Sequence, residues 1–196
     1  PDLGGIVSAT AHASGSPASY RATLTLDGDS LAAGPDLPGL DTLHVEAATD
    51  GVRVTVSSLS GAVGEARFAG TAEAALALPL ADARLDLRLT RPLPQIAGAD
   101  VALRLAAGVL HVDVPGVDTA AGIAALTAAV PLGALRAIPA LAEALAGAPL
   151  VMADGPARLF VDAPALDSWT LLPLLGLPER PERVRTDLRA DLLLDL

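Results

Sequence analysis

Residues 81–89 read Ala-Asp-Ala-Arg-Leu-Asp-Leu-Arg-Leu, and this strict alternation of apolar and charged side chains decides the fold class. Only an extended strand sends successive side chains to opposite faces. The three leucines must therefore share one face, while Arg84 and Arg88 occupy the other. The stretch predicts a β-strand with one aliphatic face and one ion-paired face.

The same period of two recurs along most of the chain. Glycine-containing pairs at Asp27-Gly28, Asp50-Gly51, Ser60-Gly61 and Ala107-Gly108 are typical turn signals between such runs. Consecutive strands joined by short turns indicate an antiparallel meander. The alternation assigns to the aliphatic faces the residues Val52, Val54, Val56, Leu85, Leu87, Leu89, Val101, Leu103, Leu105, Val112, Val114, Leu188, Leu192 and Leu194.

The pattern changes from about residue 118, where proline and glycine punctuate short leucine-rich stretches. Leucines at helical spacing after Pro131 predict a short helix within residues 132–145. A strand is expected at 157–161, a second short helix at 168–175 after Pro164, and a long alternating strand at 184–196. We therefore expect one β-rich segment over residues 1–196, with a strand meander over 1–117 and two strand-proline-helix-strand units over 118–196.

Two short helices cannot cover a sheet of about ten strands, so the sheet has to cover itself. A sandwich, a closed barrel and a sheet curled into a groove are the available solutions. Aromatic residues make up only 2% of the chain, too few for the aromatic girdles of a membrane barrel. The aliphatic faces consist of Ala, Val and Leu, which favours a smooth groove over a tightly packed sandwich. The expected fold is thus mostly β: an antiparallel meander curled into an open groove, with two short helices in the C-terminal half.

Composition and motifs argue against several classes of function. The net charge of −10 disfavours nucleic-acid binding, and the lack of cysteine excludes disulfides, thiol nucleophiles and zinc-thiolate sites. Neither a nucleophile elbow nor a phosphate-binding glycine loop occurs. His12, His44 and His111 lie on the polar faces of separate predicted strands, where no metal site is indicated. We expect no enzymatic activity, no cofactor and no metal. The chain also contains neither Lys nor Asn, residues with A-rich codons, which indicates a high-GC bacterium.

Three stretches and the overall pattern carry a resemblance to a known family. The chain opens with Leu-Gly-Gly-Ile-Val-Ser-Ala-Thr-Ala at residues 3–11, followed by Gly15 and Pro17. Ala-Val-Pro-Leu at 129–132 precedes the first expected helix, and Arg-Thr-Asp-Leu-Arg-Ala-Asp-Leu at 185–192 belongs to the closing strand. Together with strands of about ten residues and glycine turns, these features resemble the TamB and AsmA-like family.

The resemblance implies a U-shaped β-groove, a β-taco, within a longer cell-envelope protein. Such a protein is anchored in the inner membrane by a segment outside these residues, crosses the periplasm and carries phospholipid toward the outer membrane. It works with a BamA-like outer-membrane barrel partner, bound through regions outside this chain. On this reading the aliphatic residues named above line the path of phospholipid or another acyl-chain ligand. The alternative is a non-catalytic structural or protein-interaction β-domain, a sandwich or a spacer, of a surface or envelope protein, which predicts the same alternation.

Overall fold

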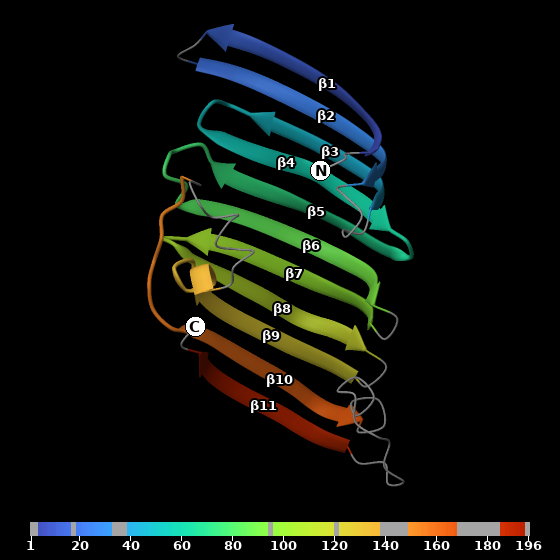
Figure 1. Ribbon diagram of the computed structural model, residues 1–196, viewed down its shortest axis with the longest axis vertical. Coiled ribbons are helices and arrows are strands. Elements are labelled where there is room, and N and C mark those ends of the chain that lie inside the picture. Colours follow the sequence, from blue (N-terminus) through green and yellow to red (C-terminus); the bar gives the residue numbers. More distant parts are fainter. Residues whose placement is uncertain are drawn as a thin grey trace.

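The computed structural model describes residues 4–16, 19–32, 39–93, 96–119, 122–137, 149–167 and 185–194, and these contain one antiparallel sheet (Figure 1). Its eleven strands lie side by side in chain order, so the predicted meander is confirmed. β1 and β11 stand at opposite ends of this order, and the sheet is open rather than closed into a barrel. The strands are β1 (Gly4–Ser16), β2 (Ser19–Ala32), β3 (Leu40–Thr49), β4 (Arg53–Val63), β5 (Ala66–Ala75), β6 (Asp82–Leu93), β7 (Ile96–Ala106), β8 (Val109–Thr119), β9 (Gly122–Pro131), β10 (Ala157–Asp167) and β11 (Arg185–Leu194).

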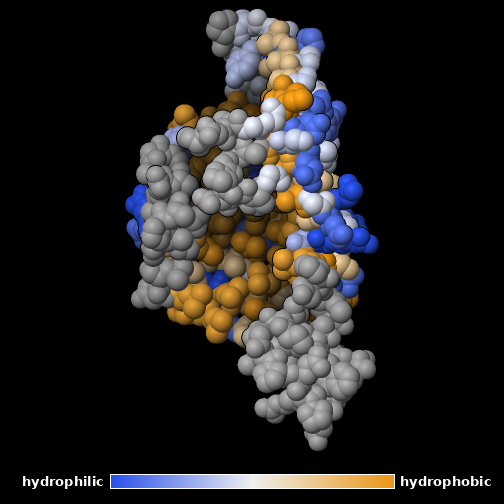
Figure 2. Space-filling model, turned by 45° about the vertical axis from the view of Figure 1, so that its right-hand side comes forward, coloured by the Kyte–Doolittle hydropathy of each residue, from blue (hydrophilic) through white to orange (hydrophobic). Residues whose placement is uncertain are grey.

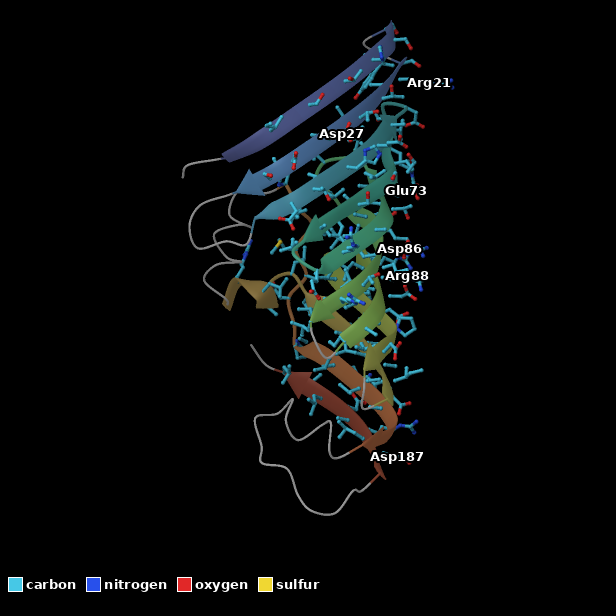
Figure 3. The ribbon with its side chains drawn as sticks, turned by 90° about the vertical axis from the view of Figure 1, so that its right-hand side faces the viewer. Arg21, Asp27, Glu73, Asp86, Arg88 and Asp187 are labelled. Carbon is cyan, nitrogen blue, oxygen red and sulfur yellow. The ribbon has the colours of Figure 1, made fainter. Side chains whose placement is uncertain are left out.

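The register of β6 shows how the sequence pattern becomes two faces. Leu87 lies opposite Val101 of β7, whereas the next residue, Arg88, lies opposite Asp100. Apolar residues therefore meet apolar residues on one side, and charged residues meet on the other. Figure 3 shows Glu73, Asp86 and Arg88 projecting from the same side of the sheet. We call the apolar side the inner face and the charged side the outer face.

Two of the four predicted turns are confirmed. Asp50-Gly51 connects β3 to β4, and Ala107-Gly108 connects β7 to β8. Gly51 and Gly108 have φ values of +87° and +81°, which glycine adopts without the steric cost that a side chain would add. Asp50 further stabilises its turn, because its Oδ1 accepts the backbone N–H groups of Val52 and Arg53, both at 2.9 Å.

The other two predicted turns are wrong, because Asp27-Gly28 lies inside β2 and Ser60-Gly61 lies inside β4. Both glycines make room for neighbouring side chains. A Cβ on Gly28 would lie 2.6 Å from Cδ1 of Leu31, and a Cβ on Gly61 would overlap the Phe68 ring. A glycine within a strand can mark a close approach as well as a turn. The chain between β4 and β5 reverses after this point, at Gly64, whose φ is +58°.

The expected helices require correction. The described part of residues 132–145 holds only the short 3-10 helix η1 (Ala134–Ala137), and no α-helix occurs anywhere in the described ranges. Residues 138–148 and the second expected helix, 168–175, lie outside the described residues. Pro164, expected to lead into that helix, instead belongs to β10. It coincides with a register shift between Ala163 and Leu166, an irregularity at which a strand tolerates proline.

Residues 149–155, which we call the rim strap, cross the ends of several strands before β10 begins. The N–H of Leu80 donates to the carbonyl of Pro149 (2.6 Å), and the N–H of Val151 donates to the carbonyl of Leu80 (3.0 Å). Farther along, the N–H of Gly133 donates to the carbonyl of Ala153 (2.8 Å). The strap thus passes from the β5–β6 connection to the end of β9, along one rim of the sheet (Figure 1, orange).

Candidate functional site

Two rows of apolar residues cross the inner face at right angles to the strands, and we call them together the apolar track. Every strand contributes one residue to each row, and no member of either row is polar. The first row consists of Ala11, Leu24, Ala47, Val56, Ala72, Leu85, Leu103, Val112, Ala128, Leu159 and Leu192. The second, which steps over the register shift between β7 and β8, consists of Ala9, Leu26, Val45, Leu59, Gly70, Leu87, Val101, Val114, Leu126, Val161 and Ala190.

The structure places the predicted aliphatic residues on this face, with one exception. Leu89, Leu105, Leu188 and Leu194 flank the two rows, opposite apolar partners in the neighbouring strands. Val54 likewise faces Ala74. Val52 precedes β4, and the residue is 73% exposed, so its assignment to the strand is wrong. Whether any of these residues binds lipid stays a prediction.

Sequence reasoning missed part of the same face. The contributions of β2, β9 and β10 to the track, among them Leu24, Leu126 and Leu159, were not among the predicted residues. Leu24 and Leu26 alternate with Thr23 and Thr25, a signal that could have identified them. Gly70 and Ala72 carry no such signal, because a small residue in a strand is compatible with either the inner or the outer face.

The inner face has no second layer among the described elements. Each strand contacts its neighbours in the sheet, and η1 contacts β9. Leu188 and Leu192, in the edge strand β11, are 43% and 45% exposed, and Leu85, Leu87 and Leu103 in the central strands are half-buried. Figure 2 shows apolar residues gathered in a hollow, with hydrophilic residues along its border. A large exposed apolar surface of this kind typically marks a binding surface.

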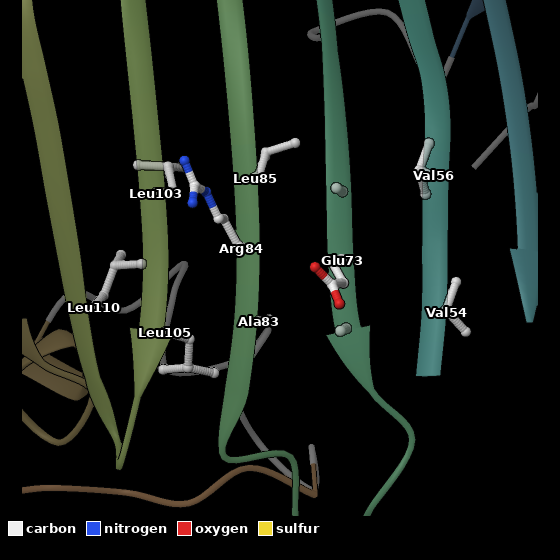
Figure 4. A pocket seen from close by; sticks show the side chains of 11 residues that line it. Val54, Val56, Glu73, Ala83, Arg84, Leu85, Leu103, Leu105 and Leu110 are labelled. Atoms are coloured by element: carbon white, nitrogen blue, oxygen red, sulfur yellow. The ribbon is translucent and has the colours of Figure 1, made fainter. Parts of the chain in front are cut away.

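A hollow of about 310 Å³ deepens the inner face over β5 (Figure 4). It arises because the side chains of Ala72 and Ala74 are short. Those of Val56 on one side, and of Leu85 and Leu103 on the other, extend farther from the sheet. Glu73 and Arg84 also border the hollow, but the register directs their side chains to the outer face. There Glu73 pairs with Arg53, and Arg84 binds Asp86 at 2.7 Å, so the charges do not interrupt the apolar lining.

The outer face is organised by ion pairs between exposed side chains. Arg158 in β10 binds both carboxylate oxygens of Asp191 in β11, at 3.0 and 2.6 Å. Arg189 in turn binds Asp162 at 3.0 Å. The hydrogen bond from Arg158 holds the pKa of Asp191 below its ordinary value. Pairs this exposed contribute little stability individually, and they mark the face of their strands that meets water.

The three histidines lie on the outer face, in three different strands. His44 Nδ1 is 2.7 Å from Asp27 Oδ1, and this hydrogen bond raises the pKa of His44. His12 lies opposite Thr23, and His111 lies opposite Arg104. Within the described ranges, no group of three His, Asp or Glu side chains is arranged to hold a metal ion. The histidines of this face are thus separate from one another, and His44 is the one that pairs with a carboxylate in the described ranges.

Comparisons with known proteins yield no relative. No family model, no curated protein and no solved structure matches the chain. No helix in the part of the chain that the structure describes is both long and apolar enough to span a membrane.

Proposed function

We propose that this chain is a segment of a lipid-carrying envelope protein, and that acyl chains of phospholipid lie along the apolar track. The observation that carries this proposal is the continuity of the track: both rows run from β1 to β11 without a polar side chain. An uncharged aliphatic surface is complementary to hydrocarbon, because both are driven out of water. It offers no hydrogen-bonding group that would select a particular polar ligand.

The length of the track favours movement of lipid along it over storage of a single lipid. Eleven strands span ten inter-strand spacings, and at about 4.8 Å each these make a path of roughly 48 Å. One leaflet of a bilayer's hydrocarbon core is about 15 Å thick. The track is therefore roughly three times as long as one acyl chain needs, whereas a site for a single lipid would end after one such length.

The resemblance to the TamB and AsmA-like family supplies the proposed setting. In that setting the sheet is part of a β-taco that carries phospholipid between the inner and outer membranes across the periplasm. An inner-membrane anchor and a BamA-like barrel partner would be engaged by regions outside these residues. The open sheet and its apolar inner face are compatible with this setting.

Two adjacent residues of β6 test the proposal. Leu87 lies in the second row of the track, whereas Arg88 lies opposite Asp100 on the outer face. Leu87→Arg places a charge among acyl chains, where an unpaired ion is strongly disfavoured. We expect the purified Leu87→Arg chain, after incubation with phospholipid vesicles, to retain roughly a tenth of the phospholipid that the wild type retains. Organic extraction followed by mass spectrometry measures this quantity.

Arg88→Ala is the matched control, because it removes only an exposed charge. It should leave the bound phospholipid unchanged, and circular dichroism should show that both variants keep their β-structure. A folded Leu87→Arg chain that retains wild-type amounts of phospholipid would refute the proposal. If the wild-type chain retains no phospholipid at all, the result would favour a structural or protein-interaction domain instead.

A further inference from the structure

The apolar track offers no place for a charged headgroup. Its two rows contain only Ala, Val, Leu and Gly in all eleven strands. A phosphate moved from water onto such a surface loses its hydration and gains no partner. A lipid whose acyl chains lie on the track keeps its headgroup in water, and a rim of the sheet, where the strands end, is the nearest place with charged side chains. This step rests on the function proposed above.

The two rims of the sheet differ. At one rim the strap crosses the ends of β6 to β9, with hydrogen bonds to Leu80 and Gly133. The strap also passes directly over Gly108, where an added Cβ would lie 2.5 Å from the nitrogen of Ala153. At the opposite rim, where β5 begins and β6 ends, the described residues include Arg67 and Arg91.

Arg67 and Arg91 lie close together on adjacent strands. Arg67 is the second residue of β5 and lies opposite Thr90 of β6 on the outer face, and Arg91 is the residue after Thr90. Both side chains are exposed, and within the described part of the chain neither has an ion-pair or hydrogen-bond partner. The arginines at positions 53, 84, 158 and 189, in contrast, are each paired with a carboxylate. Unpaired guanidinium groups present donors in the fork geometry that phosphate oxygens accept.

The backbone at Arg91 is also unusual. Its φ of +49° lies in the left-handed region that residues other than glycine seldom adopt. The position falls where the β6–β7 register shifts, between Thr90 and Leu93. It stands two residues beyond Leu89, an inner-face residue near this end of β6. Strained backbone of this kind concentrates at ligand-binding positions.

We propose that Arg67 and Arg91 bind the phosphate of an anionic lipid headgroup at this rim, while the acyl chains lie on the track. The headgroup then stays in water beside the sheet, and only hydrocarbon enters the inner face. The rim would thereby set a preference for lipids that carry a phosphate over uncharged lipids with the same chains.

Two lipids that differ only in the phosphate test this inference on the whole chain. Dioleoyl phosphatidic acid and dioleoylglycerol present identical acyl chains, so their affinities separate headgroup binding from chain binding. We expect the wild type to bind phosphatidic acid about tenfold more tightly, and this preference to weaken as salt is raised. Arg67→Gln combined with Arg91→Gln should abolish the preference and leave dioleoylglycerol affinity unchanged.

Arg104→Gln is the matched control, because Arg104 is, like Arg67, an exposed outer-face arginine without a described partner, but it lies near the opposite end of its strand, away from this rim. It should leave the preference for phosphatidic acid intact. A preference that survives in the double variant, or that falls equally with Arg104→Gln, overturns the assignment to Arg67 and Arg91 and leaves the track standing. A wild type that binds neither lipid overturns the proposed function itself and the headgroup site with it.

Discussion

Individual side chains of the inner face fit together by pairing small residues with large ones. Gly70 in β5 lies opposite Leu87, and a Cβ on Gly70 would come within 2.8 Å of Leu87 Cδ2 and overlap the carbonyl of Asp86. Gly61 in the same way accommodates the ring of Phe68. Close pairing of this kind lets neighbouring strands approach. The result is a track without polar side chains.

On the outer face, the hydrogen bond between His44 and Asp27 leads to a testable prediction about the protonation of His44. The hydrogen bond to Asp27 raises the pKa of His44 above its ordinary value of 6.5, and the charge of Glu46 acts in the same direction. This pair therefore stabilises the fold fully below about pH 6.5. The stabilisation is lost as the pH rises through the raised pKa of the folded state. Asp27→Asn should move the pKa of His44 back toward its ordinary value in an NMR titration. An unchanged pKa would mean that the pair does not form in solution.

At the scale of elements, the rim strap is held by backbone contacts that leave no room for a side chain at Gly108. Gly108 has a positive φ, and an added Cβ would meet the backbone of Met152 and Ala153. Gly64, in the β4–β5 turn, also has a positive φ, but an added Cβ there meets nothing within 4 Å. The two glycines thus share a backbone requirement and differ in the strap contact.

Alanine substitutions at these two positions measure the strap contact. Gly64→Ala should lower the free energy of unfolding by about 1 kcal/mol, the cost of left-handed backbone alone. Gly108→Ala should cost roughly 2–4 kcal/mol, because the strap must also move. Denaturant unfolding monitored by circular dichroism provides both values. Equal losses at the two positions would show that the strap is not held against Gly108.

The same elements show how far sequence reasoning reaches. Period-two alternation is a local property, so the strands of residues 81–119 and their inner residues could be predicted without the structure. Gly28 and Gly61 were misread as turns because their role is to accommodate Leu31 and Phe68, and such contacts leave no local signal. The strap depends on pairing between Leu80 and Leu150, which are far apart in the chain. Helical spacing of leucines after Pro131 could not reveal that contact, and the described residues there form only η1.

For the whole molecule, one consequence of the open meander is that its two faces meet different surroundings. The outer face carries the exposed ion pairs, and the inner face carries the apolar track. Because side chains alternate between these faces wherever the register is regular, as it is from Asp82 to Thr90 of β6, a ligand confined to the inner face must contact every second residue there. A packed sandwich would also bury every second residue, but it would exclude lipid from them.

A photocrosslinking scan along β6 distinguishes a lipid-binding inner face from a packed sandwich most directly. Benzoylphenylalanine replaces residues 84 to 89 one at a time, and each full-length chain is illuminated in the presence of phospholipid vesicles. Crosslinked phospholipid is then quantified by mass spectrometry of the protein. Lipid on the apolar track predicts strong crosslinks at positions 85, 87 and 89 and weak ones at 84, 86 and 88, following the register of β6. Equal yields at both sets of positions, or yields highest at 84, 86 and 88, would contradict binding of lipid to the inner face.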